Sequence, residues 1–187
     1  MFDRLCLDQQ PAAIVASLDG ALQALCEVTA LYDGRGFQCW LLVFDGNWAG
    51  GLGNLGHEQL EWLEDDLEGR AASTPIVVFA HIPLWSVYPD WGWGTEDAAQ
   101  ALGYLRRFGS VTVLNGHIHQ IMQKIEGNVT FHTAMSTAFP QPAPGTAPSP
   151  GPLKVPNEKL RSLLGITDVT FKRGQQRLAV IDKPLQG

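Results

Sequence analysis

The chain lacks the features that would tie it to a membrane or to a nucleic acid. Only 17% of its residues are charged and the net charge is -6, so it has no basic excess for binding a nucleic-acid backbone. No apolar run approaches the length of a membrane span, and no basic region precedes an apolar core at the N-terminus, as it would in a signal peptide. We therefore expect a cytoplasmic protein without membrane or nucleic-acid partners.

Cysteine is also scarce. Cys6, Cys26 and Cys39 are odd in number, widely spaced and without a Cys-x-x-Cys pair, which favours a reduced compartment or simple burial over a disulfide framework. What the chain does have is 45% hydrophobic residues in a length of 187 residues. This composition predicts one globular domain with a substantial core.

Three of the five histidines lie at the ends of predicted strands. His81 directly follows one apolar run, and Gly116 joins a second run, residues 111–115, to His117 and His119. Open α/β sheets place their ligands at the carboxyl ends of neighbouring strands. Two imidazoles spaced i, i+2 can share a centre if the backbone turns between them, and we expect Gly116 to allow that turn. The pattern predicts metal coordination by these histidines.

The blocks Ala80-His-Ile-Pro-Leu84 and Asn115-Gly-His-Ile-His119 resemble the last two signature blocks of the calcineurin-like metallophosphoesterases, most closely in the bacterial, cyclic-nucleotide-phosphodiesterase-like branch. The resemblance spans about residues 49–182. It implies a two-sheet sandwich flanked by helices and a dinuclear metal site. By the same resemblance, His81 and His117 would bind one metal ion and His119 the other.

The resemblance covers only the C-terminal half of such a domain. The family's Asp-x-His, Gly-Asp-x-x-Asp and Gly-Asn-His-Glu/Asp blocks supply the bridging carboxylate, further ligands and the histidine that helps protonate the leaving group. None of them occurs in residues 1–48, and no histidine precedes His57. The expected fold is therefore α/β (α+β), a partial metallophosphoesterase-like β-sandwich without its N-terminal strands. Asp45, at a predicted strand end, is a candidate replacement metal ligand.

An aromatic loop follows His81 and supplies the candidate substrate-binding residues, which are Trp85, Tyr88, Trp91 and Trp93. Loops after such strands often carry function, and these rings would wall a pocket or stack on a base or sugar. The alternative is that the rings only cover the end of the sheet.

Composition and periodicity divide the chain into four parts. Residues 1–48 are an unmatched N-terminal helix and strand, 49–139 the metallophosphoesterase-like core, 140–157 a Pro-rich surface segment, and 158–187 a C-terminal helix and strand. The expected helices are 11–31, 57–67, a third that begins after Thr95, and 160–164. The expected strands are 37–44, 75–80, 111–115, the hairpin 121–125 with 129–133, and 178–182.

Three functions fit these residues. The first is metal-dependent hydrolysis of a small anionic phosphate ester, foremost a phosphodiester, with one or two divalent transition-metal ions (Mn, Fe, Zn or Ni). The second is a hydrolase of altered specificity, for a carboxyl ester or a glycoside. The third is a non-catalytic relic or interaction module. Because half of the sandwich is missing, an apolar sheet face needs cover, and we expect a homo-oligomer.

Overall fold

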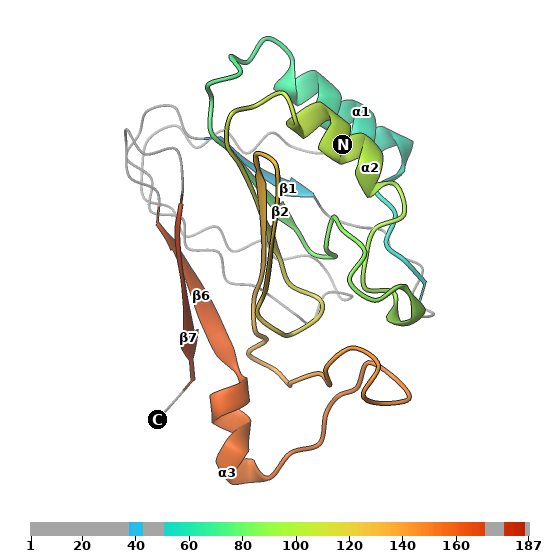
Figure 1. The fold of residues 1–187 in the computed structure, drawn as a ribbon, viewed down its shortest axis with the longest axis vertical. Helices are drawn as coiled ribbons and strands as arrows, with labels where there is room; N and C mark the ends of the chain where they lie inside the picture. Colours follow the sequence, from blue (N-terminus) through green and yellow to red (C-terminus); the bar gives the residue numbers. More distant parts are fainter. Residues whose placement is uncertain (1–37, 43–50, 171–177, 186–187) are drawn as a thin grey trace.

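A computed structural model describes residues 38–42, 51–170 and 178–185 of the chain. Figure 1 shows the arrangement of its helices and strands. The larger sheet has five strands in the order β1-β2-β3-β5-β4. All neighbours are parallel except β4, which pairs antiparallel with β5 at the edge. The strands are β1 Gln38–Leu42, β2 Ile76–Ala80, β3 Val111–Asn115, β4 Met122–Glu126 and β5 Val129–Thr133. The mixed sheet with helices confirms an α/β (α+β) composition, and the hairpin and inner strands lie within a residue of their predicted bounds.

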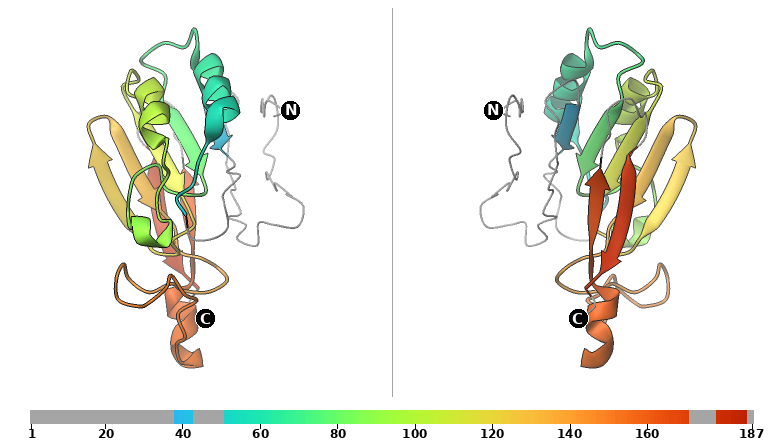
Figure 2. Two further views of the ribbon diagram at one scale, coloured as in Figure 1. Left: turned by 90° about the vertical axis from the view of Figure 1, so that its right-hand side faces the viewer. Right: turned by 90° about the vertical axis from the view of Figure 1, so that its left-hand side faces the viewer.

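Two helices cover one face of this sheet (Figure 2). They are α1 Gly56–Leu67 and α2 Ala98–Leu105. Leucines at helical spacing in α1 pack with Val78 of β2 and Val113 of β3, all of them buried, which forms the main core. None of the helices in the described ranges combines the length and the apolar character needed to cross a membrane. The predicted helix 11–31 and Asp45 lie outside the described residues.

The glycine-rich loop before α1 is tied to the start of α2. The Asp97 carboxylate accepts hydrogen bonds from the backbone N–H groups of Leu55 and Gly56, both at 2.9 Å, and so caps α1 across the fold. The sequence predicted that α2 begins directly after Thr95. That start was wrong, because α2 begins only at Ala98, and the Thr95 hydroxyl donates to the Pro83 carbonyl at 3.0 Å.

The C-terminal part forms a second, two-stranded antiparallel sheet, β6 Gly165–Thr170 with β7 Ala179–Pro184. The strand β6 was not predicted. A short helix, α3 Asn157–Leu160, is followed by a 3-10 turn at Arg161–Leu163, so the expected helix at 160–164 begins earlier than predicted. No regular element occupies residues 140–156, in agreement with the prolines there.

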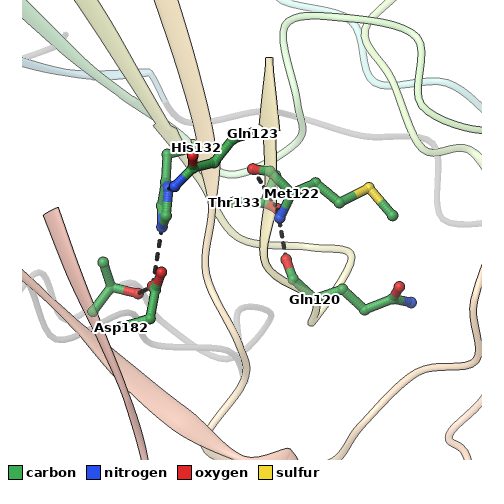
Figure 3. A network of polar contacts seen from close by, with 7 residues as sticks. Gln120, Met122, Gln123, His132, Thr133 and Asp182 are labelled. Carbon is green, nitrogen blue, oxygen red and sulfur yellow. Dashed lines mark hydrogen bonds and ion pairs between the residues drawn. The ribbon is translucent and has the colours of Figure 1, made fainter.

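A buried polar network joins the two sheets (Figure 3). His132 of β5 is 2% exposed, and its Nε2 lies 3.0 Å from an Asp182 carboxylate oxygen of β7. The Gln123 amide donates to Nδ1 at 3.0 Å, so Nε2 carries the proton and donates to Asp182. The Thr167 hydroxyl donates to the same oxygen at 2.7 Å. Every polar atom of the His132 ring is thereby satisfied.

Asp182→Ala is expected to destabilise the protein because it leaves the buried His132 N–H without an acceptor. The loss in the free energy of unfolding should be about 1–3 kcal/mol. Asp168→Ala is the matched control in the same hairpin, since Asp168 pairs with Lys183 at a half-exposed position, where an ion pair contributes roughly 0–1 kcal/mol. Urea denaturation measures both, and equal losses in the two variants would contradict the importance of the network.

Candidate functional site

The register of the central strands brings the three predicted ligands to one edge of the sheet. Ala80 pairs with Asn115 at the carboxyl ends of the parallel strands β2 and β3. His81 is the next residue after β2, and the segment that holds His117 and His119 is the continuation of β3. The Gly116 N–H donates to the His81 carbonyl at 3.1 Å, so the two chain segments stay joined beyond the strands.

A tight and strained turn presents His117 and His119. The Ile118 N–H donates to the Gly116 carbonyl at 2.7 Å, which closes a three-residue turn centred on His117. His117 has φ 64° and His119 has φ 54°, in the left-handed region that residues other than glycine rarely adopt. The sequence assigned the turn to Gly116, which was wrong, because the histidines themselves carry the unusual backbone. Strain of this kind concentrates at functional sites.

The imidazoles of His81 and His117 are in contact. Their ring centroids are 5.3 Å apart and the planes are nearly perpendicular, at 78°. His119 is close enough to lower the pKa of both rings by charge repulsion. The edge of the sheet therefore gathers all three histidines, with two of them as a packed pair.

Burial keeps these histidines neutral. It lowers the pKa of His81 from 6.5 to about 4, with the charge of His119 as the second cause. It also lowers the pKa of His117 to about 4, with the charges of His81 and His119 adding to the effect. For His119 burial again lowers the pKa. Neutral imidazoles with a free nitrogen lone pair are the form that binds a metal ion or acts as a base.

The backbone orients the His119 ring through its second nitrogen. His119 Nδ1 lies 2.7 Å from the Phe139 carbonyl, and because a carbonyl only accepts, Nδ1 carries the proton and Nε2 keeps the lone pair. The Gly92 backbone raises the pKa of His117, which identifies the nearby Gly92 group as a carbonyl acceptor. Metal-binding histidines are commonly fixed in this way.

The donor set fits a late first-row metal ion, although its coordination shell is incomplete. Two imidazoles that bind the same ion, each with a metal–nitrogen distance of about 2.0–2.1 Å, have ring centroids roughly 5 Å apart, as in the His81–His117 pair. Over residues 51–170 and 178–185, no group of three or more His, Cys, Asp or Glu side chains is arranged to hold one ion. Metal binding by His81, His117, His119 and Asp45 stays a prediction.

The four candidate substrate-binding aromatics do not form one surface. Trp91 and Trp93 are buried with Ile118 in a small second core, and Tyr88 packs on it edge-to-face with Trp91 at 4.9 Å. Trp85 belongs to the main core instead, where it contacts Phe131 at 4.9 Å. Trp93 is only 1% exposed. Trp91 and Trp93 therefore pack beneath the histidine turn through Ile118. Contact with substrate stays a prediction for these residues.

The segment after β5 contacts the histidine turn, and its individual contacts were not identified from the sequence. Phe139 orients His119 by its carbonyl and packs on the same imidazole with ring centroids 4.5 Å apart. With its amide nitrogen facing the turn, Gln141 donates to the carbonyls of Ile118 and His117 at 3.0 and 3.2 Å. In return, the Gln120 amide donates to the Pro142 carbonyl at 2.6 Å. The start of the Pro-rich segment thus holds the histidine turn in place.

Thr133 fixes the other end of the turn, where the chain enters β4. Its hydroxyl donates to the Gln120 carbonyl at 2.6 Å and accepts from the Met122 N–H at 2.7 Å (Figure 3). Thr133 is fully buried. The chain on both sides of His119 is therefore held by hydrogen bonds from neighbouring segments.

Comparison with known proteins adds no identification. No protein-family model matches the chain, and no curated protein matches it. The likeness to metallophosphoesterases therefore rests on sequence motifs of this chain alone.

The low pKa values predict that the metal-free protein loses stability in acid. Between pH 6.5 and about 4 the unfolded chain binds protons at His81 and His117 that the folded chain does not, so the free energy of unfolding should rise with pH across this window. Denaturant titrations of chelator-treated protein from pH 4 to pH 7, analysed with linear extrapolation, measure the slope.

Replacement of both His81 and His117 by glutamine should reduce the slope of the free energy of unfolding against pH. His57→Gln is the control, because the His57 side chain is 81% exposed. An unchanged slope in the double variant would refute the idea that the two rings are buried in their neutral form.

Proposed function

We propose that the protein is a metal-dependent hydrolase of phosphate esters, foremost phosphodiesters, on a partial metallophosphoesterase-like sandwich. His81, His117 and His119 are the proposed metal ligands. The observation that carries the proposal is the pairing of neutral His81 and His117 rings at 5.3 Å, beside a His119 ring whose tautomer the Phe139 carbonyl fixes. Such preset imidazoles are typical of metal and acid–base sites and cost stability in an ordinary core.

The chemistry follows from what the residues can hold. A divalent transition-metal ion, when bound, would supply a Lewis acid for the phosphoryl oxygens and a water acidic enough to attack near neutral pH. His81 and His117 provide uncharged nitrogens, so they leave the positive charge of such an ion available to an anionic ester. The Phe139 carbonyl keeps the His119 ring from rotating.

The remaining ligands would come from the part of the chain before residue 51. The strand β1 is parallel to β2, with Leu42 paired to Ala80, so the chain leaves β1 at the same edge as His81. Asp45 follows three residues later in the sequence. A carboxylate there would add a harder ligand to the two imidazoles and shift the metal preference of the site towards harder ions such as Mn. In a homo-oligomer, a second copy of the chain would cover the apolar sheet face that the missing half of the sandwich leaves exposed.

One observation favours a second candidate, the non-catalytic relic or interaction module. The described side chains alone assemble no group of three or more metal ligands. Metal content separates the two candidates, because a relic has no need to retain an ion.

The protein as purified, and after removal of metal by a chelator and reloading with Mn²⁺, Zn²⁺ or Co²⁺, should bind about one or two ions per chain. His81→Ala and His117→Ala should each weaken metal affinity by more than about 100-fold, since each removes a ligand. His57→Ala is the control, because His57 is exposed and pairs only with Glu61 of its own helix among the described contacts.

Activity is measured on chromogenic phosphodiester, phosphomonoester, carboxyl-ester and glycoside substrates, each with and without chelator. Chelator-sensitive hydrolysis of the phosphodiester, lost in both histidine variants, is the expected result. Hydrolysis of only the carboxyl ester or glycoside would replace the proposal with altered specificity. No bound metal and silent histidine variants would support the relic.

A further inference from the structure

Asn115 stands out at the end of an otherwise apolar strand. It is the last residue of β3, it is 4% exposed, and it pairs in register with Ala80 directly before His81. Large polar side chains at such buried positions occur mainly where they make specific hydrogen bonds. The contacts of this side chain show what it holds.

Asn115 and its neighbour fix three consecutive backbone carbonyls around His81. The Asn115 amide nitrogen donates to the Ala80 carbonyl at 2.7 Å and lies 3.4 Å from the Ile82 carbonyl. The Gly116 N–H donates to the carbonyl of His81 itself at 3.1 Å. The backbone on both sides of the imidazole is thereby held against β3, which limits how His81 can turn at the end of β2.

One of the two polar atoms of the Asn115 side chain makes no hydrogen bond to any described residue that would stabilise the fold. Within the described part of the chain its side-chain oxygen has no hydrogen-bond partner, although the atom is buried. An unsatisfied buried acceptor destabilises a folded protein, and native structures contain few of them, often at functional sites. The benefit of this residue therefore lies in the bonds of its nitrogen to the chain around His81.

We propose that Asn115 is a positioning residue of the histidine site, which holds His81 so that its ring meets that of His117. This role of Asn115 rests on the proposed function, since a metal ion would need the His81 and His117 rings already in place. Asn115 acts through the backbone and is not itself a ligand in this assignment. Outer residues that orient metal ligands in this manner affect metal affinity without touching the ion.

The chain contains a matched control for this arrangement. Asn128, in the turn between β4 and β5, also donates from its side-chain nitrogen to two backbone carbonyls two residues apart, those of Arg106 and Phe108. It lies at the amino end of β5, whereas the histidines lie at the carboxyl ends of β2 and β3. Loss of either asparagine removes the same kind of bond, but only Asn115 borders the site.

The test compares Asn115→Ala and Asn115→Asp with Asn128→Ala. The aspartate keeps the size of the side chain and removes its NH₂ donor. In metal-free protein, NMR should detect an Overhauser contact between the ring protons of His81 and His117, which the 5.3 Å centroid distance places within range. We expect this contact to weaken in both Asn115 variants and to persist in Asn128→Ala, while amide signals of the sheet stay in place in all three.

Co²⁺ titration, followed by visible absorption, gives a second reading. The dissociation constant should rise about 10–100-fold in the Asn115 variants and change less than about threefold in the control. An intact ring contact with unchanged Co²⁺ affinity in both Asn115 variants would overturn the proposal, and so would equal losses in Asn128→Ala or unfolding of both Asn115 variants. Absence of Co²⁺ binding by the wild-type chain would refute the hydrolase function, whereas the ring contact would still decide the role of Asn115.

Discussion

The parallel pairing of β2 with β3 is the constraint on which the rest of the site depends. Its register sets Ala80 opposite Asn115, so that the residues after both strands leave the sheet at the same level. A shift of one residue would reverse the faces of the strand side chains and separate His81 from His117. Because both strands are buried, that register is enforced by the core beneath it. The same apolar contacts that stabilise the fold therefore bring the imidazoles together.

Hydrogen bonds from backbone and side-chain groups arrange the histidines once they are brought together. The Phe139 carbonyl orients the ring of His119, and side-chain amides of Asn115 and Gln141 hold the chain next to the rings. These bonds link segments that are distant in the sequence, such as Asn115 and Ala80, 35 residues apart. The site is a product of tertiary structure, although its most visible residues occupy two short blocks.

The sequence was informative where a pattern repeats and uninformative where a single contact decides. Apolar runs located β2 and β3, and leucine spacing located α1, because burial imposes a period on the chain. The orientation of His119 by Phe139 has no such signature, since a carbonyl belongs to every residue. The turn at His117 was misassigned because glycine is the usual residue at positive φ, and neighbouring Gly116 offered it. The strand β6 begins with glycine and is partly polar, and its partner β7 was needed to recognise it.

The left-handed backbone of His117 and His119 bears on how this chain would drift under mutation. A side chain at positive φ costs of order 1 kcal/mol or more, and glycine at either position would remove that cost. If no function required these side chains, replacement of His117 or His119 by glycine would stabilise the protein. Two histidines, at positions 117 and 119, adopt this unfavourable conformation and so mark a place where folding stability has been given up.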